Sequence, residues 1–196
     1  MTRRKPKKPA PAKRRPESTT ALRQTLSSRK KAELVDTLLE LAQADRGILR
    51  QLTARFDVAA APDELVAATH QAIADATDFD ERDINHNFAY DYEAYGEVKR
   101  NLGRLIDSGQ LRLAMQLALE LMKQGSYQVE MSDEGMMTED IEDCLSVVLK
   151  PLHKCNLPAD EVIAWCSAML ASDRVGFIAR EPLQSLRDSF QAAAAR

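Results

Sequence analysis

The chain has 196 residues and a mass of 21.9 kDa, with 44% hydrophobic and 29% charged residues. This length suffices for one domain with a sizeable core, and two small helical subdomains would also fit. Seven glycines and a Leu/Ala-rich composition disfavour an all-β sandwich, which needs many tight turns. No stretch has the roughly 18 to 20 apolar residues of a membrane span, and no apolar core follows the basic start as in a signal peptide. We therefore expect a cytoplasmic, all-α protein.

Charge is distributed unevenly along the chain. Residues 1 to 16 hold eight Lys or Arg and no acid, so the total of −3 leaves −11 for residues 17 to 196. Four prolines and the lack of large apolar side chains after Met1 predict a disordered arm over residues 1–20. Its cations are candidates for nonspecific polyanion contact: Arg3, Arg4, Lys5, Lys7, Lys8, Lys13, Arg14 and Arg15. A solvated tail, or an arm folded against its own acidic body, is the alternative.

Three helices are predicted in the first half of the chain. Apolar residues at helical spacing predict the first at about 28–44, with Ser27 or Ser28 as its N-cap. The second follows Asp45 as cap, and the short connection predicts an antiparallel hairpin. Pro62 and the acids after it begin the third, which should fade near Thr77.

A polar and aromatic loop then leads into the remaining helices. The fourth is expected over 88–107, the fifth over 110–124 with Gly125 as its terminator, and these two should form a second hairpin. Thr138 should cap the sixth, which Pro151 should kink or shorten, while the seventh begins at Pro158 and the eighth spans about 180–193. The sum is an irregular array of about eight helices in a single domain, 21–196, with a possible subdivision near 78–88.

Neither a metal site nor a catalytic site is predicted. Cys144, His153, Cys155 and Cys166 lack the close pairs of a structural zinc site, and we expect free cysteines in a reducing compartment. Asp83, Asn85 and Asn87 match the start of a calcium loop, but Phe88 and Ala94 replace its required Gly and Glu. No nucleophile elbow or phosphate-binding glycine loop is present either. We expect no cofactor and no enzymatic activity.

The aromatic stretch 88–95 allows two interpretations. Its alternate aromatics could pack in the core where the third and fourth helices meet. They could instead form a recognition surface. The acids that would then receive a basic partner are Asp78, Asp80, Glu81, Asp83, Asp91 and Glu93. Under the second interpretation the partner-binding residues are Tyr90, Asp91 and Tyr92.

Three segments carry a resemblance to a known family. They are LVDTLLELAQADRGILRQL at 34–52, VKRNLGRLIDSGQLRLAMQLALELM at 98–122, and MSDEG at 131–135 before a helix that ends LKPLHK. From about residue 30 to 180 their order resembles a helical domain that bacterial proteins carry beside SWIM-type zinc fingers. The finger needs Cys-x-Cys followed by Cys-x-His, and this chain contains no Cys-x-Cys. The resemblance therefore implies a helical architecture associated with binding and transfers no functional residue.

Two functional hypotheses follow. The first is a non-enzymatic adaptor that binds a protein partner in a groove between helix pairs, with the arm adding attraction to nucleic acid or ribosomes. The second is a nucleic-acid- or ribosome-associated protein in which the arm supplies the main affinity. A metal-dependent enzyme, the third class, would need tightly bound metal.

Overall fold

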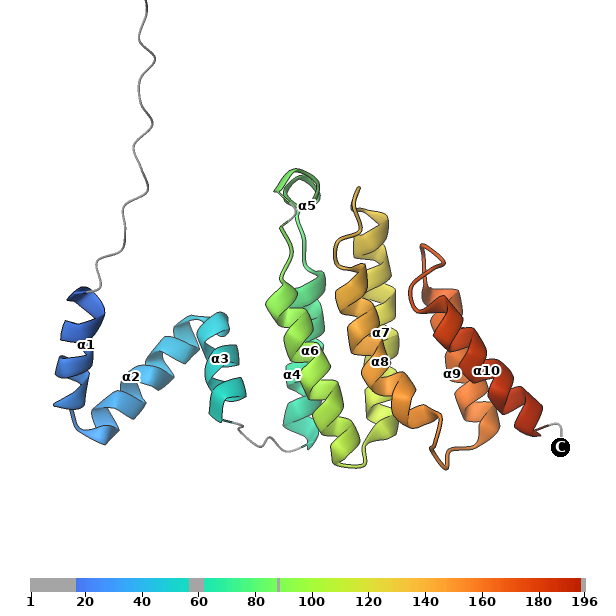
Figure 1. Cartoon of the computed structure of the whole chain (residues 1–196), viewed down its shortest axis with the longest axis horizontal. Coiled ribbons are helices and arrows are strands. Elements are labelled where there is room, and N and C mark those ends of the chain that lie inside the picture. Colours follow the sequence, from blue (N-terminus) through green and yellow to red (C-terminus); the bar gives the residue numbers. More distant parts are fainter. Residues whose placement is uncertain (1–16, 57–61, 88, 195–196) are drawn as a thin grey trace, which may run out of the picture. The chain divides into compact units, whose positions relative to one another are not determined.

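The computed structural model describes residues 17–56, 62–87 and 89–194, which form ten helices and no strand (Figure 1). The predicted all-α class is confirmed, although the number of helices exceeds the expected eight or so. The chain divides into two compact units, Met1–Asp57 and Val58–Arg196. The basic residues of the predicted arm lie outside the described residues. Among those that are described, no helix is long and apolar enough to cross a membrane.

The first unit contains α1 (Glu17–Ser27), α2 (Lys31–Ala44) and α3 (Arg46–Phe56). Asp45 caps α3 as predicted, because its Oδ1 accepts from the backbone N–H groups of Gly47 at 2.7 Å and Ile48 at 3.3 Å. The predicted serine cap of the preceding helix is wrong. Ser27 ends α1 and donates its hydroxyl to the Arg23 carbonyl at 2.8 Å, and α2 begins after Lys30, whose side chain makes no capping bond.

Little of this first unit is buried. Ala42 is the only buried residue of the range 19–56, leaving aside Ala54, whose side chain is not described. The apolar positions that predicted the helix at 28–44 are present on α2, but most of them are exposed.

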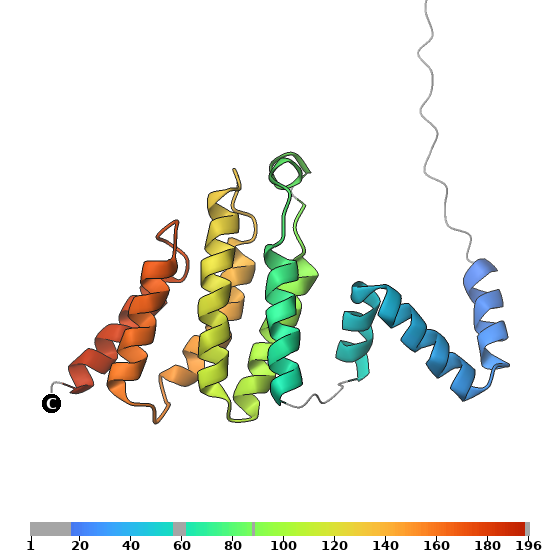
Figure 2. The same ribbon diagram turned by 180° about the vertical axis from the view of Figure 1, so that it is seen from behind.

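The second unit contains α4 (Pro62–Thr77), α5 (Glu81–Asn87), α6 (Tyr92–Asp107), α7 (Leu111–Glu130), α8 (Thr138–Leu152), α9 (Ala159–Ser172) and α10 (Arg180–Ala194). Figures 1 and 2 show α4 beside α6, α7 beside α8, and α9 beside α10. Successive helices α6 and α7 touch, but α6 packs chiefly on α4 and α8. One continuous core joins these helices, and its fully buried side chains include Ile73, Leu102, Leu121, Leu145 and Met169.

Gly125 was expected to end a helix, and this prediction is wrong. Helix α7 runs through it to Glu130, and Gly125 is buried. A Cβ atom there would stand 2.8 Å from Ile141 Cδ1, so the glycine lets α8 approach α7 closely. The glycine is therefore required by the contact with Ile141 on α8, sixteen residues away, and the residues next to Gly125 in the sequence do not indicate this contact.

Two further boundaries differ from expectation. The segment predicted as a loop contains α5, whose first turn is held by Asp80, because its Oδ1 accepts from the N–H groups of Arg82 at 2.9 Å and Asp83 at 3.1 Å. Thr138 is the first residue of α8 and not its cap, and its hydroxyl donates to the Gly135 carbonyl at 2.7 Å. Pro151 lies inside α8, in its last turn and one residue before its end, and the expectation that it kinks or shortens the helix stays a prediction.

Candidate functional site

The aromatic stretch divides between core and surface. Tyr95 is fully buried and donates its hydroxyl to Gln128 Oε1 at 2.5 Å, and the Gln128 amide donates to the Ala76 carbonyl at 3.1 Å. This chain of bonds satisfies buried polar groups of α6, α7 and α4. For Tyr95 the core interpretation therefore holds. The side chain of Phe88 lies outside the described residues.

Tyr90 lies at the boundary between core and surface. Its ring packs edge-on against Tyr95 with centroids 6.2 Å apart, and its hydroxyl donates to Asp140 Oδ2 on α8 at 2.9 Å. Partial burial, and then the hydrogen bond to Asp140, raise the pKa of Tyr90 from 10.0 to about 12. Tyr90 therefore ties the start of α6 to α8 and presents only part of its ring to solvent.

Asp91 and Tyr92 begin α6. Asp91 is the N-cap, and its Oδ1 accepts from the Ala94 N–H at 2.9 Å. This bond fixes the first turn of α6 and with it the direction of Tyr92. Tyr92 is 63% exposed, although aromatic residues of this size usually bury much of their surface.

All three predicted partner-binding residues line one open hollow of about 670 Å³. We call it the acidic–aromatic hollow, and its lining is Asp78, Phe79, Asp80, Asp83, Ala89, Tyr90, Asp91, Tyr92 and Glu93. Five of these nine residues are acids, three are aromatic, and none is Lys or Arg. These five acids belong to the six that the sequence analysis groups with the aromatic stretch; the sixth, Glu81, does not line the hollow, and Phe79 lines it although the sequence did not indicate this residue.

Helix α5, which contributes Asp83 to the hollow, is held in place by Asn85 of the partial calcium-loop pattern. Asn85 donates its amide to the Met131 carbonyl at 3.2 Å and accepts from the Asp133 N–H at 2.8 Å. Asn87 donates to Asp83 Oδ1 at 3.2 Å. The three residues of the partial calcium-loop pattern thus take part in hydrogen bonds that fix α5, and the bonds of Asn85 span 46 and 48 positions of sequence.

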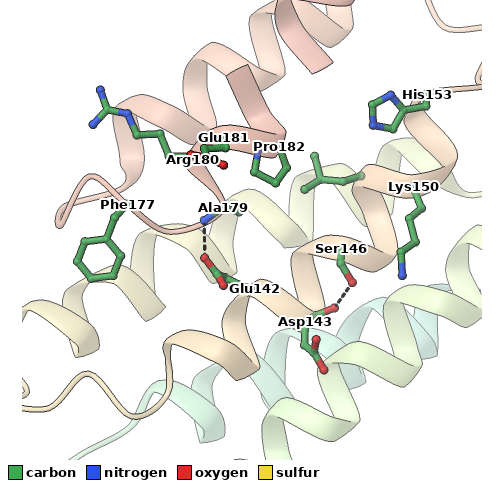
Figure 3. Close-up of a pocket in the computed structure, with 11 residues that line it drawn as sticks. Glu142, Asp143, Ser146, Lys150, His153, Phe177, Ala179, Arg180, Glu181 and Pro182 are labelled. Atoms are coloured by element: carbon green, nitrogen blue, oxygen red, sulfur yellow. Dashed lines mark hydrogen bonds between the residues drawn. The ribbon is translucent and has the colours of Figure 1, made fainter. Parts of the chain in front are cut away.

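A second cavity lies between α8 and the start of α10 (Figure 3). It measures about 710 Å³, and it runs along α8 from Glu142 to His153, with Phe177 at the far end. Several of its polar groups already hold the helices together. Glu142 Oε1 accepts from the Ala179 N–H at 3.0 Å, and Asp143 pairs with Lys99 Nζ at 2.6 Å. Glu142 and Asp143 therefore already bond to groups of neighbouring elements.

The cysteines do not converge. Cys144 and Cys166 are buried and Cys155 is partly buried, and all three are free thiols. Burial raises the pKa of Cys144 to about 12, and its sulfur contacts the Tyr95 carbonyl at 3.3 Å. The described residues contain no group of three or more His, Cys, Asp or Glu side chains arranged to hold a metal ion.

Comparison with known proteins adds no assignment to this geometry. No protein-family model, no curated protein and no solved structure matches the chain.

Proposed function

We propose that this chain is a non-enzymatic helical adaptor whose acidic–aromatic hollow binds a Lys- or Arg-bearing segment of a partner protein. The observation that supports it is the combination, in one open hollow, of the exposed Tyr92 ring with two further aromatic residues and five acids. The resemblance to a helical domain found beside zinc fingers agrees with a binding role, and it remains a prediction.

The chemistry of the hollow suits a cationic side chain. A guanidinium or ammonium group over the face of Tyr92 or Phe79 is attracted by the ring, and the carboxylates around it accept its hydrogen bonds. The apolar stem of Lys or Arg covers aromatic surface at the same time. A partner segment of opposite charge therefore fits better than an acidic or a purely apolar one.

The two kinds of lining residue should contribute differently. Exposed carboxylates attract a partner over a distance and make its association sensitive to salt, but each contributes little to affinity. An aromatic side chain that becomes covered on binding contributes more. Tyr92 is the expected anchor, because its ring is largely exposed whereas Tyr90 already bonds to Asp140.

The α8–α10 groove is the competing site, and a matched pair of variants separates the two. The probe is a fluorescein-labelled peptide of alternating arginine and serine, with a glutamate and serine peptide as its charge control. Binding to the full chain is followed by fluorescence anisotropy at several salt concentrations. Tyr92→Ala should weaken binding about tenfold. Phe177→Ala, which removes an aromatic ring that is 55% exposed in the other cavity, should change it little.

The result can contradict the proposal in two ways. If Phe177→Ala weakens binding and Tyr92→Ala does not, the partner occupies the α8–α10 groove. If the glutamate peptide binds as well as the arginine peptide, the acids of the hollow do not select the partner.

The basic arm supports the second hypothesis, in which nucleic acid is the partner. Its eight cations could contact phosphates without reading sequence, and such binding falls steeply with salt because counterions are released. The corresponding test compares binding of a duplex of mixed sequence by the full chain and by a chain without residues 1–16. If the chain without residues 1–16 no longer binds the duplex, the arm supplies the nucleic-acid affinity. If the shortened chain still binds, other residues supply it.

A further inference from the structure

The second unit already holds one of its own arginines against an aromatic ring. Arg174 lies between α9 and α10, and its guanidinium carbon stands 4.9 Å from the centre of the Tyr127 ring. The Nε of the same side chain donates to the Glu130 carboxylate. A planar guanidinium can make both interactions at once, because its face lies on the ring while its edge carries the N–H donors.

This arginine site borders the acidic–aromatic hollow. The Tyr127 ring packs against the Phe79 ring with centroids 5.9 Å apart. A neighbouring hollow of about 390 Å³ shares Asp78 and Phe79 with the acidic–aromatic hollow, and Lys123, Tyr127 and Arg174 line it as well. Two cations therefore stand near Asp78 and offset its charge.

The five carboxylates of the acidic–aromatic hollow are not equally available. Asp80 Oδ1 caps α5, Asp91 Oδ1 caps α6, and Asp83 Oδ1 accepts from an amide of its own helix. Within the described part of the chain, the carboxylates of Asp78 and Glu93 have no hydrogen bond or ion pair. Since the neighbouring cations offset the charge of Asp78, Glu93 is the carboxylate most available to a partner.

Tyr92 and Glu93 supply, at the start of α6, the two kinds of group that hold Arg174. Both residues are exposed, and both line the same hollow. We propose that the partner residue bound there is an arginine and not a lysine, with its guanidinium over the Tyr92 ring and its N–H groups bonded to Glu93. This inference rests on the proposed function, because it names which cation the same hollow selects.

The physical difference between the two cations is the reason for the selection. A lysine ammonium is a compact, strongly hydrated point charge, and an open hollow cannot remove its water. A guanidinium is more weakly hydrated, stacks flat on an aromatic face and still directs N–H groups toward a carboxylate beside the ring. An exposed ring with an available carboxylate next to it therefore favours arginine.

Three labelled peptides test the selection on the full chain by fluorescence anisotropy. The first alternates arginine with serine, the second lysine with serine, and the third is the arginine peptide with each guanidinium symmetrically dimethylated. The arginine peptide should bind about fivefold more tightly than the lysine peptide. Dimethylation keeps the charge but blocks bidentate hydrogen bonding, so the third peptide should bind about as weakly as the lysine peptide.

A matched pair of variants assigns the selection to Glu93. Glu93→Gln should reduce the advantage of arginine over lysine to less than about twofold, because the charged acceptor is lost. Glu181→Gln is the control, since Glu181 is likewise an exposed acid in the first turn of its helix, α10, and lines the α8–α10 cavity. This control should leave the advantage unchanged. Far-ultraviolet circular dichroism checks that both variants are folded.

The outcomes distinguish this inference from the proposed function. Equal binding of the arginine and lysine peptides, with both weakened by Tyr92→Ala, overturns the selection of arginine and leaves the hollow as a cation-binding site. An advantage of arginine that survives Glu93→Gln or dimethylation overturns the bond to Glu93. If neither the arginine nor the lysine peptide binds, the proposed function and this inference are both wrong.

Discussion

Helices with an apolar face occur in both units of this chain, but these faces are buried in the second unit and largely exposed in the first. In both, apolar residues recur at helical spacing, and in both these residues form helices. In the second unit the apolar faces meet in one core, whereas Ala42 is the only buried residue among those of the first unit whose side chains are described. The difference teaches that periodicity indicates that a helix has an apolar face, but it does not indicate what covers that face.

The largest effect should come from removing core volume in the second unit. Leu145→Ala should cost about 2–5 kcal/mol in the free energy of unfolding, because Leu145 is fully buried. The matched change Leu49→Ala, on an exposed leucine of α3, should cost less than about 0.5 kcal/mol. Urea unfolding followed by far-ultraviolet circular dichroism measures both, and Trp165 fluorescence reports on the second unit alone. A large effect of Leu49→Ala would mean that the first unit has a packed core in solution.

A smaller effect is expected where α7 and α8 approach each other. Gly125→Ala should destabilise the second unit by about 1–3 kcal/mol, because the new methyl group overlaps with the buried side chain of Ile141. Gly103→Ala is the control. Its Cβ would meet only Val147 at 3.9 Å, and the gain in helix propensity should stabilise α6 by about 0.5–1 kcal/mol. In thermal unfolding, Gly125→Ala should lower the midpoint temperature and Gly103→Ala should raise it. Equal shifts of the two midpoints would contradict the close approach of α7 and α8 at Gly125.

In the core of the second unit, one buried polar side chain can be replaced by an apolar one. The Nδ2 atom of Asn101 is buried and has no hydrogen-bond partner in the described part of the chain. Asn101→Leu should therefore increase the free energy of unfolding by about 1 kcal/mol. Chemical unfolding monitored by Trp165 fluorescence measures the sign of this change in the free energy of unfolding. A loss of stability would show that the amide has a partner in solution.

The smallest effect concerns Tyr90 and depends on pH. Tyr90→Phe should cost about 0.5–1.5 kcal/mol near pH 8, because it removes the hydrogen bond to Asp140. The pKa of Tyr90 is raised from 10.0 to about 12 in the folded chain, so its stabilising contribution is complete below pH 10 and is lost as the pH rises through about 12. The difference between wild type and variant should shrink over this range. A difference that stays constant with pH would mean that Tyr90 is not perturbed by burial.

Local signals predicted the elements they concern. Asp45 as the cap of α3 and Pro62 at the start of α4 were correct, because a cap or an N-terminal proline acts within one helical turn. Local signals could not distinguish the exposed Tyr92 from the buried Tyr95. The two rings lie three residues apart on α6, and only the packing of α7 and α8 makes one of them part of the core.

What the sequence by itself determined is the helical class, the positions of most helices and the grouping of Tyr90, Asp91 and Tyr92 with acidic neighbours. What only the tertiary structure decided is the role of Gly125, Asn85 and Gln128, and the existence of the hollow around Tyr92. The reason is physical. Helix starts and apolar faces depend on neighbours a few residues away, whereas the bonds of Asn85 and Gln128 join positions 33 to 52 residues apart, and no pattern along the chain encodes such a pairing.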